Sequence, residues 1–268
     1  MTIRKTVVAG QFYPNSATKI HEMFAHYNQI IETHRDSKVR VNTKPRAIIV
    51  PHAGYIYSGF TASVAYSLLQ NTKPKRIIVI GPSHRAYIDG ISICDYEQYE
   101  TPLGALTIDT NLVEELKNSF DLHFHPEAQF EHSTEVQMPF IKHYIPEASV
   151  VELVYGRQAP EALAKLIALV LKDPQNAVVI STDLSHYYDI NKAKNLDTVC
   201  LDAIEHLDTA TLHQGCEACG MIGVEAMLLY AKKAKWQPLL LDYRTSADAS
   251  GDKSQVVGYM SAAFVPRD

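Results

Sequence analysis

The sequence predicts an α/β fold in one domain, with a mostly parallel central sheet and helices on both faces. Short apolar runs rich in β-branched residues recur along the chain, and such runs are typical of strands covered on both faces. The runs are residues 46–50, 76–80, 150–154 and 177–180. Helical patterns lie between them, and this alternation indicates a parallel sheet. With 268 residues, 46% hydrophobic and 21% charged, the chain is long enough to bury its own core.

The remaining elements follow in order. Helices are predicted where periodic apolar positions end near an Asn, Lys, His or Pro stop signal. They span residues 58–70, 111–118, 132–143, 159–171, 194–206 and 222–233. Two β-type runs, at residues 238–244 and 255–264, should close the sheet with some antiparallel pairing. The polar stretch at residues 32–44 is the nearest feature to a linker, but it is short, so we predict a single domain over residues 1–268.

Composition excludes several classes of function. The net charge of -5 comes from 25 basic and 30 acidic residues without a run of like charge, which argues against nucleic acid as a partner. No apolar stretch approaches the roughly 18 residues of a membrane span, and the start of the chain lacks the apolar core of a signal peptide. We therefore expect a cytoplasmic protein that does not bind a membrane.

The four cysteines favour reduced thiols, metal ligands or small buried residues over a disulfide framework, given that compartment. Cys216 and Cys219 have Cys-x-x-Cys spacing, but a structural zinc site would need a second ligand pair that the chain lacks. A redox dithiol usually follows a strand near the start of its fold, whereas this pair lies near the end. The remaining alternative is that the Cys219 thiolate acts as a ligand together with histidines. The neighbouring Gly220 would allow the backbone to come close to such a site.

Histidines follow three of the predicted strands. His52, His84 and His186 each come within six residues of an apolar run, and the carboxyl ends of parallel strands meet at one edge of a sheet, where ligands bind. Histidine is the commonest metal ligand and the side chain most easily tuned as an acid or base. We therefore predict a metal or catalytic role for His52 and His84, and for His186 with the nearby Asp183.

The same edge should receive a fourth histidine. His132 lies near two acidic residues, Glu131 and Glu135, which would raise its basicity for proton transfer. Ser133 or Thr134 would equally suit a helix cap, so a structural role stays open. Gly54, Gly81 and Pro82 are expected in tight turns that aim the rings inward.

Taken together, these segments resemble the Memo family. The matching segments are Ala-Gly-Gln-Phe-Tyr-Pro at 9–14, Pro-His-Ala-Gly-Tyr at 51–55, Gly-Pro-Ser-His at 81–84, Glu-His-Ser-x-Glu at 131–135, Ser-Thr-Asp-Leu-Ser-His at 181–186 and Ala-Cys-Gly at 218–220. Their order and spacing cover nearly the whole chain. The resemblance implies a fold similar to the class III extradiol ring-cleavage dioxygenases.

The resemblance also implies a site and partners. In the Memo family the metal site uses two histidines and a cysteine, which correspond here to His52, His84 and Cys219, while His132, Asp183 and His186 line the same cleft. Prokaryotic members are known as protein B of the AmmeMemoRadiSam system, which implies an AMMECR-type protein and a radical SAM protein as partners. Eukaryotic members are described as signalling adaptors.

A thiolate ligand separates this pattern from the dioxygenases, which use two histidines and a carboxylate. Sulfur favours copper, zinc or an electron-rich iron, so ring cleavage does not transfer with the fold. We expect a metal-dependent oxidoreductase with one iron or copper ion, or zinc, and a small-molecule or peptide substrate. His132, Asp183 and His186 would move protons, with Asp183 orienting His186 by a hydrogen bond. The alternatives are a metal-dependent hydrolase and a non-catalytic module that binds a peptide or protein in the same cleft.

Overall fold

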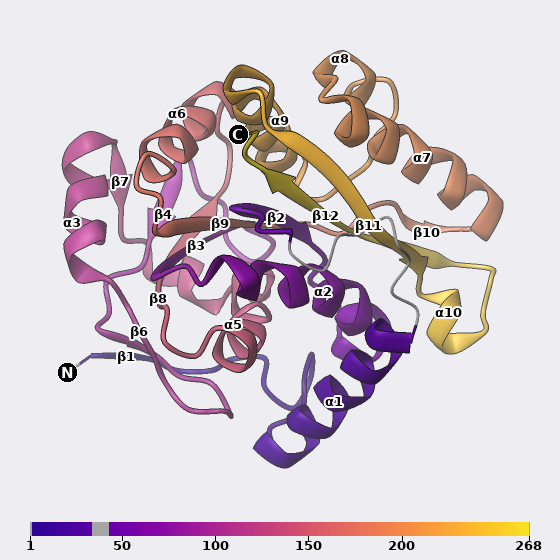
Figure 1. The fold of residues 1–268 in the computed structure, drawn as a ribbon, viewed down its shortest axis with the longest axis horizontal. Helices are drawn as coiled ribbons and strands as arrows, with labels where there is room; N and C mark the ends of the chain where they lie inside the picture. Colours follow the sequence, from indigo (N-terminus) through magenta and orange to yellow (C-terminus); the bar gives the residue numbers. More distant parts are fainter. Residues whose placement is uncertain (1, 34–42, 268) are drawn as a thin grey trace.

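A central sheet runs through the middle of the molecule, with helices packed on both of its faces (Figure 1). The structure is a computed structural model that describes residues 2–33 and 43–267. Four neighbouring strands in the centre of the sheet are parallel, in the order β2-β9-β3-β8. They are β2 (Ala47–Val50), β9 (Asn176–Ser181), β3 (Arg76–Pro82) and β8 (Ser149–Tyr155). Their apolar residues are buried, as expected for strands covered on both sides.

Antiparallel pairing flanks this parallel centre. On one side β8 pairs antiparallel with β4 (Ile91–Ile93), which is parallel to β7 (Leu122–His123). On the other side β12 (Val256–Val265) pairs antiparallel with β2, with β10 (His186–Tyr188) and with β11 (Gln237–Thr245). The predicted α/β class is confirmed, and the last two predicted runs contribute antiparallel strands to a mixed sheet.

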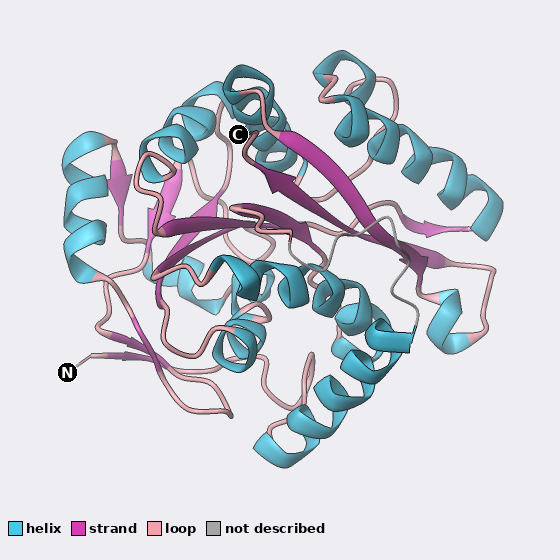
Figure 2. Ribbon diagram, in the orientation of Figure 1, coloured by secondary structure: helices cyan, strands magenta, loops and turns pink. Residues whose placement is uncertain are grey.

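The helices form two layers (Figure 2). On one face, α2 (Tyr55–Leu69) lies against β2 and β12 and contacts α1 (Ala17–Thr33) and α5 (Met138–Tyr144). On the other face, α6 (Pro160–Val170) and α9 (Met221–Ala234) pack together over β9. The remaining helices are α3 (Thr110–Ser119), α4 (His132–Glu135), α7 (Ile190–His206), α8 (Thr209–Leu212), α10 (Ala247–Ser250) and the short 3-10 helices η1 (Gln70–Thr72) and η2 (Pro126–Phe130). No helix in these described ranges has the length and apolarity needed to cross a membrane.

Two helical regions differ from the prediction. Helix α1 was not predicted, although its buried residues Ile20, Phe24, Tyr27 and Ile31 follow a helical spacing. The helix predicted over 132–143 is divided into α4 and α5. Pro139 lies in the first turn of α5, where its missing N–H is tolerated, but it could not continue a helix from α4.

A second, three-stranded sheet joins the start of the chain to the main body (Figure 1). It consists of β1 (Ile3–Arg4), β5 (Gln98–Tyr99) and β6 (Leu106–Thr107), with β1 parallel to β5. Such short strands carry no clear pattern in the sequence. Of the polar stretch at 32–44, residues 34–42 lie outside the described residues.

The structure corrects the expectation of reduced thiols for two cysteines. Cys200 on α7 and Cys216 in the loop before α9 form a disulfide with their Cα atoms 4.8 Å apart. Both residues are buried, because α7 and this loop pack against each other. Cys94 and Cys219 are free. Thus the Cys-x-x-Cys spacing combines one bonded and one free cysteine.

We expect loss of this disulfide to destabilise the protein. The bridge joins residues separated by 16 positions, and a loop of about that length corresponds to about 3 kcal/mol of chain entropy in the unfolded state. Denaturant unfolding of Cys200→Ser should show that decrease, and a reductant should reproduce it in the wild type. The same reductant should leave Cys200→Ser unchanged. Equal stability of the oxidised and reduced wild type would contradict a stabilising role of this bridge.

Candidate metal centre

The carboxyl ends of β2, β9 and β3 lie side by side at one edge of the sheet, because these strands are neighbours and parallel. His52 follows β2, Asp183 follows β9 and His84 follows β3. Helix α4 contacts β3 and brings His132 to the same edge. The strand order therefore places side chains from four separated segments near one another.

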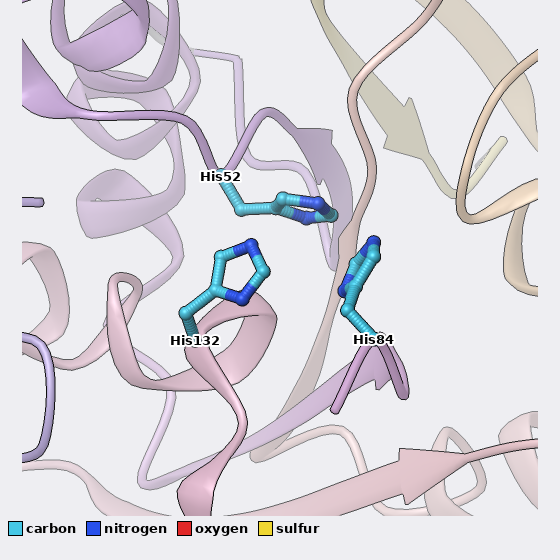
Figure 3. Close-up of side chains that lie close together, drawn as sticks. All are labelled: His52, His84 and His132. Carbon is cyan, nitrogen blue, oxygen red and sulfur yellow. The ribbon is translucent and has the colours of Figure 1, made fainter. Parts of the chain in front are cut away.

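His52, His84 and His132, which we call the histidine centre, point their imidazole rings toward a shared space (Figure 3). One nitrogen from each ring lies within 4.8 Å of the others. The ring centroids are 5.1 Å apart for His52 and His84, 5.4 Å for His52 and His132, and 4.7 Å for His84 and His132. Three imidazoles at these separations could hold one metal ion.

The tautomer of His52 follows from its neighbours. Its Nδ1 lies 2.9 Å from the Ser181 hydroxyl, which donates its hydrogen to the Ser133 carbonyl. Because the hydroxyl has one hydrogen to give, it accepts from His52, so Nδ1 carries the proton and Nε2 presents a lone pair. Burial lowers the pKa of His52 well below its usual value, assisted by the charges of His84 and His132. The ring is therefore neutral, as a metal ligand must be.

Glu131 contacts the other two rings of the histidine centre, His84 and His132. Its carboxylate caps α4 by accepting from the backbone N–H groups of His132 and Ser133. The same oxygen lies 3.1 Å from His84 Nδ1 and 2.9 Å from His132 Nδ1. Burial by itself would raise the pKa of Glu131, but the close contact with the His132 ring and the hydrogen bonds from the ring and backbone of His84 and the backbone of Ser133 outweigh it and hold the pKa well below the usual value. The cap is thus Glu131, whereas the sequence pointed to Ser133 or Thr134.

Cys219 lies beside the histidine centre. Its Sγ is 3.3 Å from His52 Nε2, and two donors bound tetrahedrally to one ion at about 2.0 and 2.3 Å lie about 3.5 Å apart. Burial and the charge of Asp183 raise the pKa of Cys219 to about 12, so without a cation it is a thiol. Gly220 permits this position, since a Cβ there would lie 2.6 Å from the Thr182 Cβ.

The structure places Asp183 and His186 differently from expectation. One Asp183 oxygen accepts from the His52 backbone N–H at 2.7 Å, and the other lies 4.0 Å from His52 Nε2. Asp183 therefore hydrogen-bonds His52, and the expected hydrogen bond to His186 is not formed. Burial raises the pKa of Asp183, opposed by the His52 hydrogen bond and by the charge of His186. His186 begins β10 and is partly exposed at the rim.

Gly81 and Pro82 also differ from expectation, because they belong to β3 and not to a turn. A Cβ on Gly81 would lie 2.6 Å from Ser133 Oγ. Glycine thus allows α4 to approach β3 closely, and this contact brings His132 toward His84.

Three supporting residues were missed by the sequence reasoning. Ser181 orients His52, and Gln137 donates to Ser181 and to the Pro51 carbonyl, both at 2.9 Å. Phe12 packs against the His132 ring with centroids 4.6 Å apart. Phe12 and Ser181 both lie inside matched motif segments, which is the signal that could have drawn attention to them. Gln137 carries no such signal.

Comparison with known proteins decides the family. A family model described as Memo-like protein matches residues 4–263. The chain belongs to the Memo family. Among its relatives, a MEMO1 family protein of Aquifex aeolicus is 32% identical across 99% of this chain and 100% of its own length. A MEMO1 family protein of Metallosphaera sedula is 34% identical across 97% of this chain and 99% of its own length. The Memo resemblance predicted from the sequence is confirmed over nearly the full length.

Proposed function

We propose that this Memo-family protein is a metal-dependent oxidoreductase that holds one iron or copper ion at the histidine centre. His52 and His84 would bind the ion, with Cys219 as a thiolate ligand and His132 on the remaining side. The observation that carries the proposal is the convergence of three imidazoles from β2, β3 and α4 on one space. A mixed nitrogen and sulfur donor set suits copper, iron or zinc and not magnesium or calcium.

The surrounding residues fit a bound cation. His52 is neutral and turns a lone pair to the centre, while Glu131 faces the Nδ1 atoms of His84 and His132, which leaves their Nε2 atoms for an ion. Buried carboxylates are costly unless they are compensated by donors or positive charge. Glu131 is fully buried and Asp183 almost so. A cation would also favour the thiolate form of Cys219.

A redox-active ion bound there would supply electron transfer and would polarise a substrate atom. The protein would orient the substrate and move protons. Asp183, whose carboxylate lies 4.0 Å from His52 Nε2, would exchange a proton inside the centre, and the partly exposed His186 would exchange protons with solvent. His132, which packs against Phe12, would move protons on its side of the centre, as the sequence predicted.

A second candidate function is peptide or protein binding, which exposed apolar residues on the segments that carry the site favour. Most exposed large hydrophobic side chains of the described residues lie within five positions of His52, His84, His132 or His186. They are Ile56, Tyr57, Tyr87, Phe130 and Tyr187. Exposed apolar side chains on the segments that carry the site would suit an extended ligand as well as a small aromatic substrate.

The location of the protein and its protein partners are two further proposals. We propose a cytoplasmic location, which the composition of the chain led us to expect. An AMMECR-type protein and a radical SAM protein are proposed as partners from the family resemblance alone.

Elemental analysis tests the proposed function. The protein would be purified without oxygen or added metal and compared with Cys219→Ser. Iron or copper near one ion per chain, reduced in the variant, is the expected result and would justify assays of oxygen consumption. Zinc alone would favour metal-assisted hydrolysis. If the protein contained no metal and took up no iron, copper or zinc on titration, the proposal of a metal-dependent enzyme would be wrong. Peptide or protein binding would then be the remaining candidate function.

A further inference from the structure

We propose that Glu131 is a positioning residue whose single carboxylate lies against two imidazoles of the histidine centre, His84 and His132, and keeps the proton of His84 on Nδ1. The inference rests on the proposed function, because orienting the rings matters for metal binding. The contacts that support it are all made within this chain. It assigns a role to the first residue of the Glu-His-Ser-x-Glu segment at 131–135, which is not itself one of the expected metal ligands.

The two carboxylate oxygens of Glu131 contact donors from separate segments. Oε1 lies near the Nδ1 atoms of both rings and accepts from the backbone N–H groups of His132 and Ser133. Oε2 accepts from the His84 backbone N–H at 2.5 Å. Capping of α4 explains only the two backbone contacts within that helix. The contacts with the backbone and ring of His84, which is 47 positions away, tie the end of β3 to α4.

The charge around Glu131 supports an orienting role. Within residues 2–33 and 43–267, its ion-pair partners are histidines, and no lysine or arginine side chain pairs with it. The nearby Arg4 guanidinium donates to the Glu131 backbone carbonyl and to Glu135. A fully buried carboxylate without a cationic partner depends on donated hydrogen bonds. The imidazole N–H group of His84 supplies part of this compensation.

An ionised carboxylate can only accept hydrogen bonds. It therefore selects the tautomer in which His84 carries its proton on Nδ1, and leaves the Nε2 lone pair for an ion. Carboxylates that hold metal-ligating histidines in this way also raise ligand basicity. The His132 Nδ1 contact is short, but it lacks the alignment of a hydrogen bond. We therefore expect His84 to depend on Glu131 more strictly than His132 does.

The test combines Glu131→Gln with a matched control, Glu127→Gln. Glu127 lies 3.7 Å from His125 Nδ1, but it is exposed and outside the centre. Long-range ¹⁵N–¹H spectra of the metal-free proteins would identify the imidazole tautomers, and titration with zinc alone would give the affinity. We expect Nδ1–H at His84 in the wild type and in Glu127→Gln. In Glu131→Gln we expect loss of that tautomer and zinc binding weakened by about 10- to 100-fold.

Three results would overturn the proposal: an Nε2–H tautomer of His84 in the metal-free wild type, an unchanged tautomer in Glu131→Gln, or zinc affinity within twofold of the wild type. Glu131→Asp keeps the charge and should retain more of the Nδ1–H tautomer than Glu131→Gln does, whereas a purely structural role would predict equal loss in both. If the wild type bound no metal, the proposed function would fail, but the tautomer measurement would still decide the role of Glu131.

Discussion

The double variant His52→Ala/His84→Ala is expected to lose its bound metal completely. These two residues follow β2 and β3, which flank β9 at the same sheet edge. Both belong to the donor set predicted from the sequence and to the histidine centre of the structure. Their removal would leave His132 and Cys219, and two donors cannot complete the three or four protein ligands that such ions require. Metal content of protein purified without oxygen, followed by titration with iron, copper or zinc, measures the effect.

A second double variant provides the control. His123 and His213 are exposed histidines that pair with Asp121 and Glu225 away from the centre. His123→Ala/His213→Ala should keep the metal content of the wild type. Melting curves of the metal-free proteins would show whether each variant is folded. A stoichiometric ion in folded His52→Ala/His84→Ala would rule out the histidine centre as the metal site.

Replacing Arg4 with methionine is expected to lower the free energy of unfolding by about 3–5 kcal/mol, the usual cost of removing one partner from a buried ion pair. Arg4 is 2% exposed and donates to the fully buried Glu135. Glu135 also accepts from the backbone N–H groups of Val7 and Val8 and from the Tyr13 hydroxyl. These donors cannot neutralise its charge, so the carboxylate would stay buried without a cation.

The neighbouring residue is a matched control for this prediction. Lys5 pairs with Glu100 at 2.9 Å, but their side chains are 66% and 40% exposed, so Lys5→Met should change the stability by about 1 kcal/mol or less. Thermal unfolding would distinguish Arg4→Met from Lys5→Met, since a change of 1 kcal/mol in the free energy of unfolding shifts the melting temperature by about 2 °C in a chain of this length. Similar melting temperatures for Arg4→Met and Lys5→Met would contradict a stabilising role of the buried pair.

Arg4→Met also tests how the start of the chain supports the site. Glu135 ends the short helix α4, which begins at His132, and its contacts with Val7 and Val8 attach the segment that carries Phe12. Loosening this attachment should disturb the packing of Phe12 on His132. The sequence offered no sign of this pair, because its two charges are 131 positions apart.

The apolar runs were sufficient to predict the four central strands, because a strand covered on both faces needs apolar side chains at nearly every position. They also predicted which residues follow the strands, and hence that His52, His84 and Asp183 lie at one edge. These features depend on local composition and on the geometry of parallel sheets, so they can be derived without a structure. The Memo segments supplied the family in the same way.

The tertiary structure alone decided which side chains meet. The order β2-β9-β3, the close approach of α4 to Gly81 and the break before α5 set His132 beside His84, and no local pattern encodes such packing. The hydrogen bond of Asp183 to His52, the shared carboxylate of Glu131 and the disulfide between Cys200 and Cys216 likewise join residues distant in sequence. Side-chain partners across elements depend on the register and packing of the whole core, and these are fixed only when the chain is folded.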